Sequence, residues 1–140
     1  MPAIKASLDQ LNAFIPGTLG ESLGIVFTDV GEDFIAAKMP VDHRTVQPYG
    51  ILHGGASVAL AETLGSVASQ LVAGTEHQCV GVEINANHLK SVREGFVHGV
   101  SKPYRIGRNM HVWNIEITDD SNNLVCVSRL TVLVKGKKPE

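Results

Sequence analysis

Residues 54–73 of the chain read GGASVALAETLGSVASQLVA. Valine and leucine recur in this segment with helical spacing, and glycine or alanine fills most of the remaining positions. The pattern predicts one long helix that is apolar or small all round and therefore buried on all sides. Gly74 follows directly and is a suitable C-terminal stop. The segment contains one charged residue, Glu62, near its middle.

Segments of strand type lie on both sides of this helix. Residues 23–30 and 34–39 precede it, with a short helix at 6–14 before them, and strands are expected at 78–89, 95–104, 109–118 and 124–134. Polar residues at 119–123 form a turn between the last two strands. Connections of hairpin length favour a largely antiparallel sheet. We expect an α+β fold with a single domain over residues 1–140, in which the sheet covers the apolar helix.

The composition is that of an ordinary globular domain. Of the 140 residues 44% are hydrophobic and 19% are charged, with a formal net charge of −2. A nucleic-acid-binding protein normally carries a basic excess. We find no signal-peptide h-region and no run approaching the roughly 18 uncharged apolar residues of a membrane span. Cys79 and Cys126 lie in apolar runs and suit reduced thiols. We therefore expect a cytoplasmic protein without nucleic-acid or membrane partners, and a frayed basic tail at Lys135, Lys137 and Lys138.

Glu62 is the first candidate for chemistry. A carboxylate in a buried helix is costly unless its pKa shifts or a partner compensates it, and such groups concentrate at functional sites. We favour a functional role for Glu62. The alternative is a structural glutamate that pairs with an arginine or caps a strand amide. Ser66 lies one turn later on the same face and could hydrogen-bond a water or the carboxylate.

The start of the helix is the second candidate. Gly54 and Gly55 contribute amides that lack intrahelical acceptors, and this positive end of the helix dipole suits the oxyanion of an acyl transfer. Glycine also lets a ligand carbonyl approach the backbone closely. Gln47 and His53 lie beside this position. The alternative is that the glycine pair only permits tight packing at the corner between loop and helix.

The two candidates are too far apart to act together within one helix. Gly54 and Glu62 are eight residues apart, which is about 12 Å along the helix axis. The Glu62 side chain leans toward the N-terminus but covers less than half of that gap. We therefore expect Gly54, with Gln47 and His53, to act with Glu62 of a neighbouring subunit.

The segment from Gln47 to Glu62 resembles the hot-dog thioesterases. The stretches MPVDHRT (39–45), EINANH (83–88) and SRLT (128–131) share the resemblance, which extends over nearly the whole chain. The branch of 1,4-dihydroxy-2-naphthoyl-CoA thioesterases of menaquinone biosynthesis is the most similar, with the enterobactin proofreading thioesterases as near siblings.

The resemblance implies a fold, an assembly and a mechanism. It implies a long helix wrapped by an antiparallel sheet, dimers that pair into tetramers, and hydrolysis of acyl-CoA, with an aromatic acyl group, to free acid and CoA. Glu62 would be the nucleophile or general base, and the Gly54 amide and Gln47 would polarise the thioester carbonyl. His53 would support the carbonyl-binding loop or the leaving thiolate, and Ser66 would position water. Tyr49, where close relatives usually carry phenylalanine, leaves the acyl group open.

The resemblance also implies the residues that contact CoA, which enters as part of the substrate and not as a separate cofactor. These are Gly81, His88, Leu89, Lys90, Ser91, Arg105, Ile106, Gly107, Arg108, Asn109 and Met110. The basic side chains among them could face phosphates, for which charged hydrogen bonds are strong. The alternative is that they are solvated charges at strand ends. The six histidines show no paired spacing typical of metal ligands, and no metal is expected.

Three other functions remain open from the residues. A hot-dog hydratase or dehydratase could use His53 and Glu62 as acid and base, since fold does not fix function. A proofreading enzyme would hydrolyse aryl-carrier-protein thioesters. A non-catalytic acyl-CoA sensor would need an output domain, for which the chain has no spare length. A lyase releases no free thiol from acyl-CoA, which separates it from a thioesterase.

Overall fold

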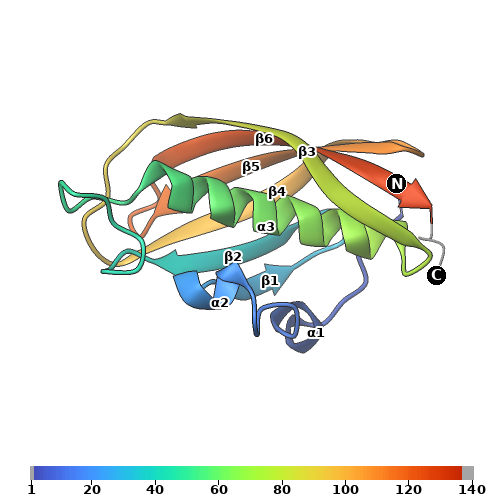
Figure 1. Cartoon of the computed structure of the whole chain (residues 1–140), viewed down its shortest axis with the longest axis horizontal. Coiled ribbons are helices and arrows are strands. Elements are labelled where there is room, and N and C mark those ends of the chain that lie inside the picture. Colours follow the sequence, from blue (N-terminus) through green and yellow to red (C-terminus); the bar gives the residue numbers. More distant parts are fainter. Residues whose placement is uncertain (1, 137–140) are drawn as a thin grey trace.

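A six-stranded sheet curves around one long helix in the computed structural model, which describes residues 2–136 (Figure 1). The strand order is β1-β2-β4-β5-β6-β3, and every neighbouring pair is antiparallel. The elements are α1 (Leu8–Asn12), α2 (Leu19–Leu23), β1 (Val26–Val30), β2 (Ile35–Pro40), α3 (Gly54–Ala73), β3 (His77–His88), β4 (Phe96–Ile106), β5 (Met110–Asp119) and β6 (Leu124–Gly136). Lys137 and Lys138 of the expected tail lie outside the described residues.

The long helix α3 has the predicted bounds. His53 precedes it as N-cap in an extended conformation, and its side chain accepts a hydrogen bond from the Gly55 N–H. At the other end Gly74 has a φ of 84°, which a residue with a Cβ rarely adopts, and its N–H bonds to the Gln70 carbonyl oxygen. Both ends of the helix are thus closed by local groups.

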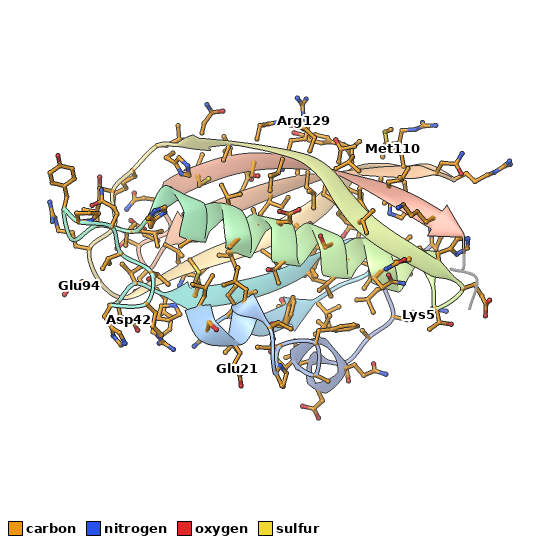
Figure 2. All side chains as sticks on the ribbon, in the orientation of Figure 1. Lys5, Glu21, Asp42, Glu94, Met110 and Arg129 are labelled. Atoms are coloured by element: carbon orange, nitrogen blue, oxygen red, sulfur yellow. The ribbon has the colours of Figure 1, made fainter. Side chains whose placement is uncertain are left out.

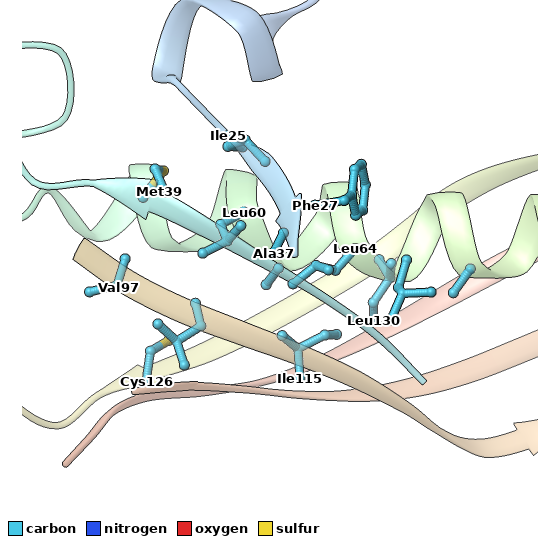
Figure 3. Packing of buried hydrophobic residues seen from close by; sticks show 14 of the residues in the cluster. Ile25, Phe27, Ala37, Met39, Leu60, Leu64, Val97, Ile115, Cys126 and Leu130 are labelled. Carbon is cyan, nitrogen blue, oxygen red and sulfur yellow. The ribbon is translucent and has the colours of Figure 1, made fainter. Parts of the chain in front are cut away.

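One face of α3 packs on the sheet. Leu60 and Leu64 are fully buried and point toward the strands (Figure 3). The approach is close, because a Cβ on Gly99 of β4 would lie 2.6 Å from the Leu64 Cδ1. Burial of a leucine side chain typically contributes about 1.5–3 kcal/mol to stability. This buried face fixes the helix and every side chain on it relative to the sheet.

The opposite face of α3 is only half-buried, which corrects the prediction of burial on all sides. Glu62, Thr63, Ser66 and Val67 all have intermediate exposure in the single chain. By length and composition α3 could also cross a membrane, contrary to the expectation that no stretch comes close. Because one face of α3 is buried against the sheet, we interpret α3 as the core helix of a globular domain.

The N-terminal region differs from the prediction. The helix expected at 6–14 shortens to α1, which begins after a capping box formed by Ser7 and Gln10. A second short helix, α2, occupies the start of the strand expected at 23–30. It forms because the Thr18 side chain accepts from the Gly20 N–H and Gly24 closes the helix with a φ of 74°.

A buried polar cluster joins the C-terminal half of α3 to β5. The Ser69 Oγ accepts a hydrogen bond from the Trp113 Nε1 at 2.6 Å and lies 3.0 Å from the His111 Nδ1. Burial lowers the pKa of His111 and so favours the neutral imidazole. The Ser101 hydroxyl on β4, by contrast, is fully buried and has no partner within residues 2–136. The two serines therefore contribute oppositely to stability.

Replacement of these serines tests the difference. Ser69→Ala leaves the Trp113 N–H unpaired and should lower the free energy of unfolding by about 1–3 kcal/mol. Ser101→Ala removes an unpaired hydroxyl and should leave that free energy unchanged or raise it by about 1 kcal/mol. Urea denaturation of both variants beside the parent measures the two values. Equal destabilisation by both would contradict the assignment.

Candidate functional site

A pocket of about 310 Å³ opens at the N-terminal end of α3. Loop residues, the first turn of the helix and the segment after β3 form its wall. The lining residues are Gln47, Ile51, Leu52, Gly54, Ser57, His88, Leu89, Lys90, Ser91 and Val125. Several polar groups therefore converge on one concave space, which is the usual arrangement of a small-molecule site.

The loop before α3 holds Gln47 in one orientation. The Gln47 N–H donates to the Ile51 carbonyl oxygen and the Gly50 N–H donates to the Gln47 carbonyl oxygen, each at 2.9 Å. The Gln47 Oε1 accepts from the Tyr49 N–H. Because its oxygen is occupied in this way, the side-chain amide is left with its NH₂ group as a donor.

At the start of α3 one amide remains open. The His53 Nδ1 accepts from the Gly55 N–H at 2.7 Å, so the proton of the neutral imidazole lies on Nε2. The Gly54 N–H finds no acceptor in the part of the chain that the structure describes. His88 packs against Gly54, where a Cβ would lie 2.8 Å from its Nε2. The open N–H at the positive end of the helix can donate to an oxygen of a ligand.

Glu62 lies on a different pocket, also of about 310 Å³. Its wall combines the half-exposed face of α3 with the segment that joins α1 to α2. The lining residues are Phe14, Ile15, Thr18, Leu19, Gly20, Glu62, Thr63, Ser66 and Val67. The carboxylate also lies against Gly81 of β3, where a side chain would collide with it.

Glu62 has no protein partner in the single chain. Within residues 2–136 no arginine, lysine or backbone amide forms an ion pair or hydrogen bond with its carboxylate. Residues 2–136 therefore contain no arginine or strand amide that would make Glu62 a paired, structural glutamate. A half-buried carboxylate that lines a pocket and has no protein partner is typical of a group that interacts with a ligand.

The structure keeps the two candidate groups apart. The pocket at Gly54 and the pocket at Glu62 share no lining residue. Gln47, His53 and Gly54 lie together at the start of α3, whereas Glu62 and Ser66 lie about two to three turns further along. One copy of the chain thus presents two separate candidate half-sites, one at Gly54 and one at Glu62.

The residues expected at CoA fall into three places. His88, Leu89, Lys90 and Ser91 line the Gly54 pocket, and Gly81 lies beside Glu62. Arg105, Ile106, Gly107, Arg108, Asn109 and Met110 form the hairpin between β4 and β5. Met110 and Glu94, a residue just after Ser91, lie at opposite ends of the molecule (Figure 2). One chain therefore does not gather these residues around a single ligand.

Sequence reasoning missed part of the Gly54 pocket. Ile51, Leu52 and Val125 form an apolar wall, and Ser57 contributes a hydroxyl. The sequence contains a signal for Ser57, because residues three apart in a helix share a face and Gly54 is three residues earlier. Val125 carries no such signal, since only the fold places β6 beside this loop.

Lys90 is engaged in an ion pair. Its Nζ lies 2.5 Å from the Asp119 Oδ2, and the backbone N–H groups of Ser121 and Asn123 also donate to the Asp119 carboxylate. The Lys90 ammonium and then the Asn123 N–H hold the pKa of Asp119 well below its usual range. The ion pair fixes one wall of the pocket to the turn between β5 and β6.

Comparison of the sequence and structure with known proteins identifies the family of this chain. The thioesterase superfamily matches residues 49–126, more than half of the chain. A 1,4-dihydroxy-2-naphthoyl-CoA hydrolase of Escherichia coli is 52% identical over 130 residues, which cover 93% of this chain and 96% of that protein. A proofreading thioesterase, EntH, of Cronobacter sakazakii is 48% identical over 130 residues, covering 93% and 95%. A thioesterase of Haemophilus influenzae superposes with a TM-score of 0.95 at 48% identity, covering 100% and 99%. The expected hot-dog fold is confirmed.

The depressed pKa of Asp119 predicts a pH dependence of stability. Its folded-state pKa lies below the unfolded value, so its contribution is complete above about pH 4 and is lost as the pH falls below that value. Asp119→Asn should therefore show a shallower loss of the free energy of unfolding than the parent between about pH 4 and pH 2. Lys90→Met should have a similar, smaller effect. Urea denaturation at a series of pH values measures the free energy of unfolding of the parent and both variants. If this free energy falls equally with pH in all three, the predicted role of Asp119 is wrong.

Proposed function

The chain belongs to the thioesterase superfamily, and on this premise we propose that it hydrolyses acyl-CoA thioesters to free acid and CoA. The observation that carries the proposal is the half-buried Glu62 carboxylate, which faces a pocket and has no partner within the described residues. Such a carboxylate can attack a carbonyl or remove a proton from water.

The start of α3 supplies the groups that polarise the carbonyl. The open Gly54 N–H and the Gln47 NH₂ line the same pocket and can donate to one thioester oxygen. His53 has a supporting role in this scheme. Its Nδ1 caps the Gly55 N–H, so the side chain holds the first turn of the helix in place.

Glu62 activates the attacking group. In the general-base form, a water held by Ser66 attacks the carbonyl carbon and gives its proton to the Glu62 carboxylate. The tetrahedral intermediate then collapses, the carbon–sulfur bond breaks, and the leaving CoA thiolate takes up that proton. In the nucleophilic form Glu62 attacks first and water hydrolyses the resulting anhydride. Isotope labelling in a single turnover distinguishes the two forms.

The complete site is composed of two subunits. Support comes from the two separate half-sites and from two exposed surfaces of the single chain. Val82 of the edge strand β3, next to Gly81, is 58% exposed, and one face of α3 is only half-buried. In this assembly Gln47, His53 and Gly54 of one copy face Glu62 and Ser66 of another. The CoA segments at 88–91 and 105–110 likewise come from different copies. We extend the proposal to a homotetramer, a dimer of dimers, in the cytoplasm.

An aromatic acyl group is the proposed substrate class. The Glu62 pocket has an apolar wall formed by Phe14, Ile15, Leu19 and Val67, which suits a ring system. The Escherichia coli relative is named for 1,4-dihydroxy-2-naphthoyl-CoA, and we propose this thioester, and with it menaquinone biosynthesis. The Cronobacter sakazakii relative has a similar sequence identity to this chain and is named as a proofreading thioesterase. Aryl-carrier thioesters are therefore the second candidate.

A hydratase or dehydratase finds less support. It would need His53 and Glu62 on one substrate as acid and base. They are nine residues apart, which is about 13 Å along the axis, and the His53 Nδ1 is occupied by the Gly55 N–H.

Thiol release tests the reaction and the role of Glu62. The parent should release free thiol from hydroxynaphthoyl-CoA or benzoyl-CoA, and Glu62→Gln should lower kcat by at least about 1,000-fold because no other group in its pocket can act as the base. Medium-chain acyl-CoA and an aryl-carrier thioester complete the panel. Glu32→Gln, at an exposed carboxylate between β1 and β2, is the control and should retain parental rates. No release from any thioester would remove the proposal.

Mixed oligomers test the shared site. Gln47→Ala and Glu62→Ala chains should each be nearly inactive alone, whereas chains refolded together should regain up to about half of the parental activity per mixed dimer, because one of its two sites is intact. Native mass spectrometry confirms that the chains have mixed. Mixed oligomers without regained activity would show that both groups act within one chain.

A further inference from the structure

Ser57 in the first turns of α3 has an unusual hydroxyl. The residue is 2% exposed, yet it lines the pocket that also contains Gln47 and Gly54. In the described part of the chain the side-chain hydrogen bonds around this position involve Gln47, His53 and Thr63, and none involves the Ser57 Oγ. Unlike the enclosed Ser101 hydroxyl, the unpaired Ser57 Oγ opens onto this pocket and is therefore available to a ligand.

Other hydroxyls on the same helix show how such groups are normally satisfied. Thr63 donates to the Ala59 carbonyl oxygen at 2.7 Å, one turn back, and Ser69 pairs with Trp113. The corresponding acceptor for Ser57 is the His53 carbonyl oxygen, which already accepts from the N–H groups of Ala56 and Ser57 at 3.0 and 3.3 Å. The local acceptor is thus occupied, which leaves the Ser57 hydroxyl free.

Ser57 lies on the same face of α3 as Gly54, whose amide is open. The two residues are three apart on one helix face, about 4.5 Å along the axis. The Ser57 side chain leans toward the N-terminus and hence toward Gly54. Both groups can therefore reach a single oxygen atom, which Glu62 of the same copy cannot.

We propose that the Ser57 hydroxyl is a third hydrogen-bond donor to the oxyanion of the reaction. The inference rests on the proposed thioester hydrolysis. A thioester carbonyl oxygen has two lone pairs, which the Gly54 N–H and the Gln47 NH₂ occupy. When the carbonyl carbon is attacked, its oxygen becomes an alkoxide with a third lone pair, and the Ser57 O–H donates to it. The bond forms mainly in the transition state, so Ser57 should affect kcat more than KM.

A nucleophilic role for Ser57 does not fit its surroundings. A serine nucleophile needs an adjacent base to take its proton. Within residues 2–136 no imidazole or carboxylate accepts from the Ser57 Oγ, and Glu62 on the same helix is five residues away on another face. The hydroxyl thus keeps its proton and can only donate it in a hydrogen bond.

Steady-state kinetics of Ser57→Ala test the proposal. We expect kcat for the best thioester of the panel to fall about 10- to 100-fold while KM changes less than about 2-fold. The melting temperature should stay the same or rise, because the lost hydroxyl has no protein partner. Ser57→Cys, with a weaker donor, should fall between Ser57→Ala and the parent.

Ser69→Ala is the matched control, a buried serine on the same helix with a structural partner. It should lower the melting temperature and leave kcat per folded molecule near the parental value. Parental kcat in Ser57→Ala, with release still dependent on Glu62, would overturn the role of Ser57 and leave the proposed hydrolysis intact. A joint fall of kcat and melting temperature in Ser57→Ala would assign Ser57 to the fold. No thiol release by the parent would remove the proposed function itself.

Discussion

The rigid geometry of one α-helix determines how this protein can work. α3 begins at Gly54 and is held against the sheet by Leu60 and Leu64, so it cannot bend to bring its start and its middle together. Eight residues of helix separate the open amide at Gly54 from the carboxylate at Glu62, about 12 Å. A thioester carbonyl is a single point and cannot span that distance. This distance is the reason for proposing that the half-sites on one chain are complementary parts of a larger site.

The surroundings of each half-site fit this division. At the start of α3, the His53 ring accepts from the Gly55 N–H, whereas the Gly54 N–H, the Gln47 NH₂ and the Ser57 hydroxyl have no partner within residues 2–136. At the middle, Gly81 leaves space for a carboxylate that no positive side chain in the described residues neutralises. One half-site offers donors to a developing negative charge, and the other offers a base. Neither half is complete for acyl transfer alone.

The sequence predicted α3 and the separation of its two groups well, because glycine punctuates both ends and Glu62 interrupts an otherwise uncharged run. It missed α2 and began the first strand too early at Leu23, because the cap at Thr18 is a weak signal and Leu23 and Ile25 look like part of a strand. The strand order could not be predicted, because β3 pairs with β6 across a long stretch of chain. Val125 became a candidate only once the fold had placed β6 beside the loop at Gln47, whereas the helical spacing from Gly54 already contained a signal for Ser57.

A crystal structure with a non-hydrolysable ketone analogue of an aromatic acyl-CoA would test the shared site most directly. The account predicts that the analogue's carbonyl oxygen accepts from the Gly54 N–H of one copy, with the Glu62 carboxylate of another copy within about 4 Å of the carbonyl carbon. The Ser57 hydroxyl should lie on the same side as the Gly54 N–H. An analogue bound with Gly54 and Glu62 of a single copy, or bound away from Glu62, would contradict the account.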